Sequence, residues 1–436
     1  MSAAAVLLLA VVGTLVPIAV LRPWIGFLGY TWLSFMVPHR LVGGAVANAP
    51  LAKVIALATL VGLLFTDARH PLPRRRELLL LVTFWVVCAA STVFVALQPE
   101  RAWTDLAQFS KIVLMTGVAL VLFRDRRKLR WWLVVIALSI GALAIGGGAY
   151  AMATGFARLL FGPPGSIVGD NNSLGFALTM VAPLLALLAV DEERPWLRPL
   201  LLVGFFFTLV AVVATYSRGS FVGLCVVVPL LLFLVPDKTL IVTTCAAALT
   251  VAVLAPPPWR ARVETITPAA YRETQSGAQR MRSWYAAWRL GTDHPLLGAG
   301  FRPFSPPVYE RYVPGYSDYH DAHNHWLQVL AEHGFVGLTV FVALLASVAG
   351  RLWHVLSSPP RDPSRAWTKP VAQMVLLSLV AYAVGGIFIN SPYFELLYQL
   401  MAVAIVVDDI ARSAGAAEPT VARPLAAVLA DRLRRP

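Results

Sequence analysis

QRMRSWYAAWRLGTDHPLLGAGF at positions 279–301 and YHDAHNHWLQVLAEHGFVGL at positions 319–338 lie largely inside the one long polar insert of an otherwise apolar chain. Four of the protein's eight histidines fall within fourteen residues of the second segment, at positions 320, 323, 325 and 333. An apolar chain with one polar insert is typical of a membrane protein with one large loop outside the bilayer. We therefore expect any chemistry to lie in this insert.

The rest of the chain is strongly apolar. Hydrophobic residues make up 58% of the sequence and charged residues 14%, and the mean hydropathy is +0.70. Soluble domains contain about a quarter of charged residues, so this composition excludes an ordinary soluble globule. Apolar runs recur at residues 4–21, 24–37, 51–66, 78–97, 109–123, 131–148, 172–190, 200–215, 221–235, 240–254, 335–350, 371–389 and 394–407.

These runs predict membrane-spanning helices. A bilayer core about 30 Å thick requires about 20 helical residues, and flanking residues lengthen most runs to that size. The expected fold class is an all-α polytopic membrane protein with about 12 (12–13) transmembrane helices and one large, mostly helical periplasmic loop. The run at 24–37 is short enough to be re-entrant or interfacial. The run at 4–21 lacks the basic flank of a cleaved signal, so we expect it to be retained.

Positive charge gathers in short loops. The formal net charge of +13 would suggest a nucleic-acid partner in a soluble chain. In a membrane protein, Lys and Arg in short loops mark the cytoplasmic side. We therefore expect a cytoplasmic C-terminus and no nucleic-acid partner, whereas the side of the N-terminus depends on whether the second run spans. The basic segments, all consistent with one alternation of spans, are 74–76, 124–130, 351–369 and 432–435.

Four regions follow from this alternation. We expect a first transmembrane bundle of about 9–10 helices, a periplasmic loop domain, closing transmembrane helices and a basic cytoplasmic tail, at residues 1–254, 255–334, 335–410 and 411–436. Four shorter loops share the outer side with the loop domain, at 99–105, 149–171, 216–220 and 390–393. The three cysteines lie within apolar runs, so we expect no disulfide framework.

Two polar residues mark the outer loops of the first bundle. Asp170 lies in GPPGSIVGDNN, which predicts a turn in which Asn171 or Asn172 caps the next helix. Alternatively, the Asp170 carboxylate could orient a cation or a sugar hydroxyl. Arg218 lies in the tight TYSRGS turn at the membrane edge. It either snorkels to the interface or is a fixed cation that faces an anionic group.

Lys111 lies just inside the outer end of a predicted span. An intramembrane lysine faces protein or water rather than lipid and is by default part of a functional site. Glu395, just inside the outer end of the last span, could be its partner. Snorkelling to the interface would explain Lys111 equally well.

An arginine and two indoles share one predicted helix face in the insert. Arg280, Trp284 and Trp288 fall at i, i+4 and i+8 of a segment with helical periodicity. This helix could lie on the membrane as an amphipathic element with an aromatic belt. It could instead direct an arginine, held by aromatic packing, toward a phosphate or a sugar. Arg282 faces nearly the opposite way, and the spacing to Trp284 favours Arg280.

The remaining segments of the insert predict a tight turn and a short helix. In HPLLGAGF (294–301), glycine permits a close approach of backbones. The segment lacks the Gly-Lys-Ser/Thr ending of a phosphate-binding loop. Further along, Asp321 is the expected N-cap of a helix at His323–Glu332, and Gly334 is its expected C-cap.

The histidine cluster could bind a metal or supply a base. A zinc site is weakly indicated, because no His-Glu-x-x-His motif is present and His323 and His325 would point to different faces of a helix. Polar histidines at a membrane surface are the simpler alternative. One histidine in a first helical turn beside arginines suits general-base chemistry near neutral pH, which favours His323. We expect no metal and no cofactor.

Two arginines and one histidine on the outer face suit one reaction class. Guanidinium groups form bidentate, permanently charged hydrogen bonds to phosphate oxygens and could replace a divalent ion. A histidine could accept the proton of an attacking hydroxyl. Together they are compatible with glycosyl transfer from a membrane-anchored sugar diphosphate. A substrate that lives in the bilayer would explain why the enzyme does too.

In this order and on this side of the membrane, the motifs resemble those of the O-antigen ligase superfamily. That family joins lipid-linked bacterial glycans to an acceptor on the periplasmic face. The resemblance covers most of the chain, with about a dozen spans, one large late loop and closing spans. The motif segments are SRG (217–219), RMRSW (280–284), HPLLGAGF (294–301), AHN (322–324) and EHGFVGL (332–338).

The resemblance implies a metal-independent, inverting transfer of polysaccharide from undecaprenyl diphosphate to a hydroxyl of the lipid A-core oligosaccharide. This reaction belongs to lipopolysaccharide biosynthesis at the periplasmic face of the bacterial inner membrane. The implied partners are the undecaprenyl diphosphate-linked glycan, the lipid A-core oligosaccharide and the lipid bilayer. Arg218 and Arg280 would hold the diphosphate, and His323 would activate the acceptor hydroxyl. Further residues expected to bind substrate are Arg282, Asp170, Lys111, Asn324 and Trp284.

The acceptor stays open at this point. The GDNN segment at 169–172 resembles a subgroup of O-glycosylation ligases associated with exosortase systems. Relatives with similar motifs include O-antigen polymerases and protein O-oligosaccharyltransferases. A lipid-linked glycan transporter is a hypothesis from another class. It predicts ionisable residues near the bilayer midplane and repeated halves, whereas here these residues gather at one face and the sequence has no internal repeat.

Overall fold

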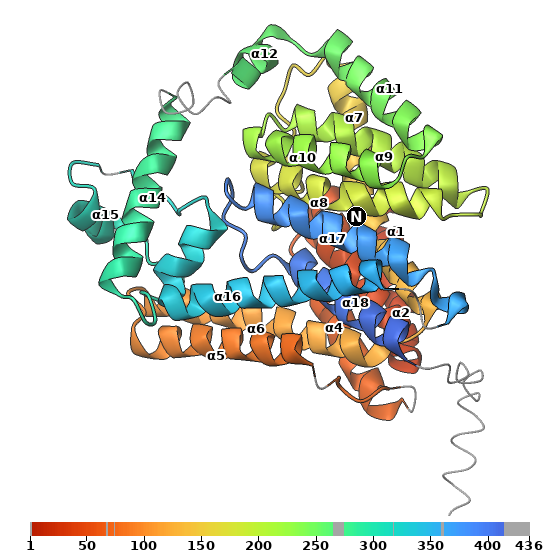
Figure 1. The fold of residues 1–436 in the computed structure, drawn as a ribbon, viewed down its shortest axis with the longest axis horizontal. Coiled ribbons are helices and arrows are strands. Elements are labelled where there is room, and N and C mark those ends of the chain that lie inside the picture. The colour runs from red at the N-terminus through yellow and green to blue at the C-terminus, as the bar shows by residue number, and fades with distance from the viewer. Residues whose placement is uncertain are drawn as a thin grey trace, which may run out of the picture.

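A computed structural model describes residues 2–66, 69–73, 75–264, 274–316, 318–358 and 362–413 (Figure 1). Within these ranges every regular element is a helix. The elements are α1 (Ala3–Leu21), α2 (Pro23–Phe35), α3 (Pro38–Val42), η1 (Gly44–Val46), α4 (Leu51–Phe65), α5 (Arg76–Phe94), α6 (Pro99–Leu122), α7 (Arg126–Ala153), α8 (Asn171–Val190), α9 (Leu197–Ala214), α10 (Arg218–Leu234), α11 (Lys238–Leu254), α12 (Pro257–Glu264), α14 (Gln275–Asp293), α15 (Pro306–Tyr312), α16 (His325–Ser357), η2 (Pro363–Arg365), α17 (Thr368–Gly385) and α18 (Glu395–Arg412).

The apolar runs of the sequence all fall on helices. Each run overlaps one helix from α1, α2, α4 to α11 or α16 to α18. Eight described helices are long and apolar enough to cross a membrane, and α4, α10 and α11 are shorter apolar helices. The prediction of an all-α polytopic membrane protein is therefore confirmed, whereas the count of about 12 spans stays a prediction. The short second run forms α2, which has 13 residues.

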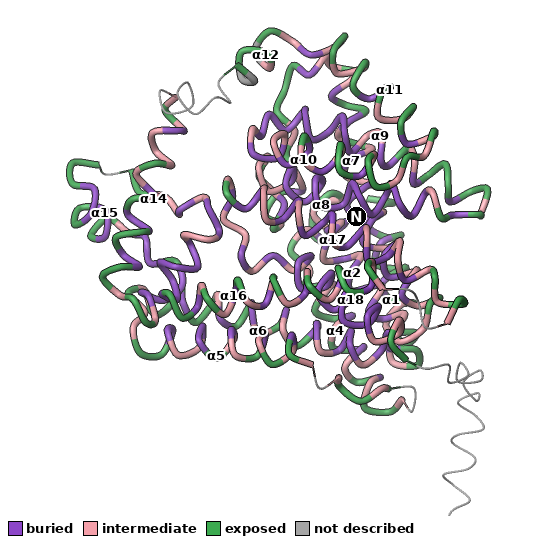
Figure 2. The backbone as a smooth tube through the Cα atoms, in the orientation of Figure 1, coloured by how far each residue is buried: buried purple, intermediate pink, exposed green. Residues whose placement is uncertain are grey.

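The helices differ in how deeply they are buried (Figure 2). In α8, 89% of the apolar window is buried, against 22% in α1, so α8 is a central helix. Small residues permit its close packing. A Cβ on Gly175 would lie 2.6 Å from Ser220 Oγ and 2.8 Å from Thr215 Oγ1. This contact sets the start of α10 beside the start of α8.

Cys88, Cys225 and Cys245 are free thiols.

Ion pairs gather basic loops at one end of the bundle, which we call the inner end. Arg75 and Arg124 both pair with Asp409, at 2.6 and 2.7 Å. Arg351 pairs with Glu77 and with Asp408, one residue before Asp409. Three of the four basic segments therefore meet the C-terminal end of α18. Residues 414–436, which contain the predicted tail, lie outside the described residues, as do Arg74 and Arg361.

The loops predicted to share the outer side come together at the other end, which we call the outer end. In Figure 1, α14 and α15 lie beyond the ends of α5, α6 and α16. Backbone contact between Leu97 N and Ala299 O, at 3.0 Å, joins the α5–α6 turn to this region. His325 N donates to Gly386 O at 2.8 Å and joins α16 to the end of α17.

Candidate functional site

Arg218 is the first residue of α10 and points toward α14. Ser217 caps the helix, its side chain accepting from Ser220 N. Tyr216 precedes it with a positive φ of 56°, and its hydroxyl donates to Phe156 O at 2.8 Å. Arg218 Nη2 donates to Ser276 Oγ, in the first turn of α14, at 2.7 Å. This hydrogen bond brings the TYSRGS turn to the insert, fifty-eight residues later.

Asp170 caps the neighbouring helix, α8. Its Oδ1 accepts from Asn172 N at 2.9 Å and from Ser173 N at 3.0 Å. The prediction that Asn171 or Asn172 is the N-cap was therefore wrong. Asn171 instead donates from Nδ2 to Thr215 O at 2.9 Å and ties this loop to the Arg218 turn. Aspartate is as good an N-cap as asparagine, so the sequence alone did not separate the three.

The helix predicted around Arg280 is present as α14. Thr274 caps it by accepting from Gly277 N. Arg280 lies one turn after Ser276, so it shares the face that meets Arg218. Arg282 lies elsewhere: its guanidinium stacks over the ring of Tyr316, 3.7 Å from the centroid. This geometry supports the choice of Arg280 over Arg282.

His323 lies before α16, not inside it. The prediction of a helix from His323 with Asp321 as N-cap was wrong: Asn324 caps α16 by accepting from Trp326 N and Leu327 N, at 3.0 and 3.1 Å. The reason is the backbone of His323, whose positive φ of 46° cannot continue a right-handed helix. The break predicted at Gly334 is present, with a φ of 66°.

The imidazole of His323 interacts with charges from three parts of the chain. Partial burial lowers its pKa below the usual 6.5, and the positive charge of Arg280 lowers the pKa further. The carboxylates of Asp321 and Asp170 act in the opposite direction. Two other predicted site residues, Asp170 at the N-cap of α8 and Arg280 on α14, therefore lie within electrostatic range of His323. A neutral imidazole at neutral pH follows, as a general base requires.

The other histidines of the cluster have different surroundings. His325 and His333 are fully buried, and His325 stacks on Tyr382 with ring centroids 4.4 Å apart. His320 Nε2 pairs with Asp318 at 3.0 Å. Among the residues that the structure describes, no three His, Cys, Asp or Glu side chains are grouped as metal ligands.

The glycine motifs have a structural role. Ala299 N and Gly300 N each donate, at 2.9 Å, to the carbonyls of Ala331 and Glu332. A Cβ on Gly298 would lie 2.5 Å from the backbone of Glu332, so only glycine fits there. The expected close backbone approach is confirmed, and its partner is the end of the helical segment that follows His323.

A buried hydrogen-bond chain supports His323 and was missing from our sequence predictions. Gln328 Oε1 accepts from Ala322 N at 3.0 Å, and Gln328 Nε2 donates to Glu332 Oε1 at 2.6 Å. Tyr393 Oη donates to Glu332 Oε2 at 2.6 Å and also bonds to His333 Nε2 at 2.6 Å. The i, i+4 spacing of Gln328 and Glu332 was the only local signal.

Two predicted partners are not brought together. Lys111 is exposed on α6 and donates to Gln108 of the same helix at 3.2 Å. Glu395 is partly buried and accepts from Gln399 Nε2 at 2.8 Å, and it also hydrogen-bonds to Tyr30 and Ser34 of α2. The suggestion that Glu395 pairs with Lys111 was therefore wrong, because Lys111 bonds within α6 and Glu395 bonds within α18 and to α2.

Two further predicted residues, Trp284 and Asn324, differ in their hydrogen bonding. Trp284 holds a buried indole Nε1 without a hydrogen-bond partner among the described residues. Asn324 uses its Oδ1 as the helix cap. The cap fixes where α16 starts and hence where the preceding His323 lies.

Two protein-family models match the chain. Residues 203–342 match the O-antigen ligase family, and residues 4–190 match a family of unknown function, DUF5935. The search of curated proteins returned no match. The first match contains Arg218, Arg280 and His323, and it confirms the resemblance to the O-antigen ligase superfamily over that part of the chain.

Proposed function

We propose, from the premise that residues 203–342 form an O-antigen ligase domain, that this membrane protein transfers a glycan from undecaprenyl diphosphate to a hydroxyl of a lipid A-core oligosaccharide. The domain supports a ligase- or polymerase-type role in polysaccharide biosynthesis. The single observation that carries the finer proposal is the grouping of Arg280, Asp170 and His323, with Arg218 bonded to the same helix as Arg280.

Arg218 and Arg280 form the donor side in this proposal. A diphosphate carries its charge on several oxygens, and guanidinium groups match these oxygens with paired hydrogen bonds. Arg218 Nη2 is oriented by Ser276, one helical turn from Arg280. The two cations would stabilise the negative charge that develops on the leaving diphosphate.

His323 acts as the general base. The acceptor oxygen attacks the anomeric carbon as the bond from that carbon to the phosphate oxygen breaks. The bonding electron pair leaves with undecaprenyl diphosphate, and the hydroxyl proton moves to His323. Attack opposite the leaving group inverts the anomeric centre. The lowered pKa of His323 keeps its imidazole neutral and able to take this proton.

The proposed location follows from the same arrangement. The basic inner end would face the cytoplasm of a bacterial inner membrane, because Lys and Arg mark that side. The outer end, with Arg218, α14 and His323, would then face the periplasm. Lipid-linked glycan and lipid A-core both reach such a site from the bilayer.

The test uses Arg218→Ala, Arg280→Ala and His323→Ala in cells that lack the chromosomal copy. We expect loss of long-chain lipopolysaccharide with accumulation of lipid-linked glycan. Arg311→Ala, an exposed arginine on α15, is the matched control and should leave the glycan ladder unchanged. Unchanged ladders in all three site variants would refute the proposal.

A second experiment identifies the acceptor. Purified protein is given lipid-linked glycan together with either a second glycan lipid or a pilin-like protein. Transfer to one of these acceptors would identify a polymerase or a protein glycosyltransferase instead.

A further inference from the structure

Backbone strain gathers around the candidate site. Five described residues other than glycine have a positive φ: Val37, Phe156, Tyr216, Arg302 and His323. Side chains rarely adopt this conformation, and it persists where the surrounding structure holds it. Tyr216 and His323 belong to the segments of the proposed donor site. Arg302 does not, so its strain requires another explanation.

Three contacts hold Arg302 in this conformation. Its backbone N donates to Glu332 Oε1 at 3.0 Å, and its carbonyl accepts from Gln98 Nε2 at 2.9 Å. Its Nε pairs with Asp105 Oδ2 at 2.6 Å. The side chain nevertheless stays 61% exposed. Glu332 and Gln98 therefore fix the backbone, whereas the side chain stays largely exposed.

The same buried carboxylate also sets the position of His323. Glu332 Oε1 accepts from Gln328 Nε2, and Gln328 Oε1 accepts from Ala322 N, the residue before His323. Asp321 interacts electrostatically with both His323 and Asp105. Arg302 and the segment that carries the proposed base are therefore both hydrogen-bonded to one Glu332–Gln328 pair.

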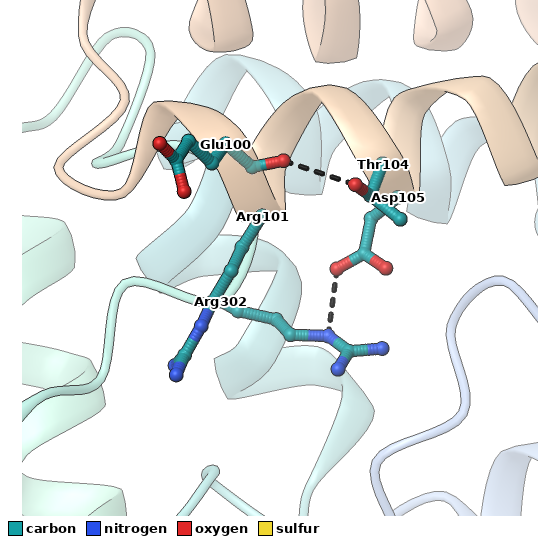
Figure 3. Close-up of a pocket in the computed structure, with 5 residues that line it drawn as sticks. All are labelled: Glu100, Arg101, Thr104, Asp105 and Arg302. Atoms are coloured by element: carbon teal, nitrogen blue, oxygen red, sulfur yellow. Dashed lines mark hydrogen bonds and ion pairs between the residues drawn. The ribbon is translucent and has the colours of Figure 1, made fainter.

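Arg302 lines an open pocket at the outer end of α6 (Figure 3). Its volume is about 270 Å³, just below the range of about 300–1,000 Å³ for small-molecule sites. Figure 3 shows Arg101 extending away from α6, and the guanidinium of Arg302, which comes from a separate segment, facing Asp105 on α6. The lining residues are Glu100, Arg101, Thr104, Asp105 and Arg302.

The charge balance of this pocket indicates its ligand class. Two guanidinium groups and two carboxylates leave no net charge, in contrast to the pair Arg218 and Arg280. A phosphate would require an excess of cations. A sugar presents hydroxyls that donate to carboxylates and accept from guanidinium groups. The second oxygen of Asp105 and the Nη atoms of Arg302 supply both kinds of partner.

We propose that this pocket binds the acceptor saccharide and that Arg302 is its central residue. The inference rests on the proposed function, because it assigns the second substrate of the same reaction. The donor would lie on the Arg218–Arg280 side of His323 and the acceptor sugar on the Arg302 side. The Glu332–Gln328 pair would fix the position of His323 relative to the acceptor pocket.

The experiment compares Arg101→Ala and Arg302→Lys with wild type in nanodiscs that contain the full chain. Steady-state transfer is measured at varied acceptor and varied donor concentration. We expect KM for the lipid A-core acceptor to rise about tenfold, the loss of one charge-assisted hydrogen bond, with KM for the donor unchanged. Arg311→Ala is the matched control. An unchanged acceptor KM, or equal increases in both KM values, would overturn the inference.

A binding measurement separates this inference from the proposed function. Native mass spectrometry without donor follows retention of lipid A-core and of lipid A without core sugars. Wild type should prefer the sugar-bearing lipid, and Arg101→Ala and Arg302→Lys should lose that preference. If the variants lose this preference but wild type shows no glycan transfer, the assignment of the acceptor pocket is supported and the proposed reaction is refuted. If wild type shows no preference, the pocket is not a saccharide site.

Discussion

His323 combines a strained backbone with a side chain whose pKa is lowered. Its positive φ removes it from α16 and leaves the imidazole near Arg280, Asp170 and Asp321. Asn324 is therefore the N-cap of α16.

The charges around His323 predict two opposite pH shifts. Neutral His323 is the active form, so transfer should fall as the pH drops through a pKa that lies below 6.5. Arg280→Gln removes a positive charge and should raise the pKa of His323. The residual activity of this variant should therefore begin to fall at a higher pH. Asp170→Asn removes a negative charge and should move this fall to lower pH. The readout is kcat/KM against pH, and shifts in the same direction would contradict the assignment.

Gly334 is a second position where one residue decides local structure. It has a φ of 66°, and a Cβ there would lie 2.6 Å from the Leu296 carbonyl. Gly334→Ala should therefore lower the free energy of unfolding by about 1–3 kcal/mol or more. Gly350→Ala, further along α16 with open space around it, should be neutral or slightly stabilising. Thermal unfolding in detergent would measure both, and equal midpoints would contradict the account.

At the scale of elements, α16 joins the insert to the membrane helices. Its first turns carry Gln328, Glu332 and His333, which bond to the His323 loop, to Arg302 and to Tyr393 before α18. A fourth contact reaches α5, where Ser91 Oγ bonds to His333 Nδ1 at 2.6 Å. A fully satisfied buried chain of this kind fixes one arrangement of helices.

Tyr393→Phe tests this chain. The substitution removes one hydroxyl and leaves both Glu332 Oε2 and His333 Nε2 short of a partner in the interior. We expect a loss of about 1–3 kcal/mol in unfolding free energy, the cost of unsatisfied buried groups. Tyr398→Phe removes one hydroxyl, which donates to Pro392 O, and it should cost less, about 1 kcal/mol. A larger effect at Tyr398 would contradict the role of the chain.

At the scale of the whole molecule, the inner end of the bundle contributes to stability and the outer end carries the candidate site. Ion pairs of Arg351 with Glu77 and Asp408 hold the inner end together. The candidate site occupies the outer end. Asp408→Asn should therefore lower stability, by about 3 kcal/mol because it leaves a buried arginine partly unpaired, without changing donor affinity. Glu193→Gln, an exposed acid, is the control. Loss of donor affinity in folded Asp408→Asn protein would show that the ends are coupled.

The sequence predicted what depends on local pattern. Apolar runs predicted the helices because length and hydropathy are local properties, and periodicity predicted the helix that carries Arg280. The cap at Asn324 was missed because the positive φ of His323 is not apparent from the helical pattern of the sequence. Glu332 was missed because its partner Tyr393 lies 61 residues away. Long-range pairing of this kind leaves no periodic signal in one sequence.

The most direct test of the account is the affinity of the purified protein for undecaprenyl diphosphate, measured for wild type, Arg218→Ala, Arg280→Ala and His323→Ala. The account predicts a loss of about 10- to 100-fold for each arginine variant, because each removes charge-assisted hydrogen bonds to phosphate. His323→Ala should bind like wild type and fail only in transfer. Undiminished affinity in both arginine variants, or a loss confined to His323→Ala, would contradict it.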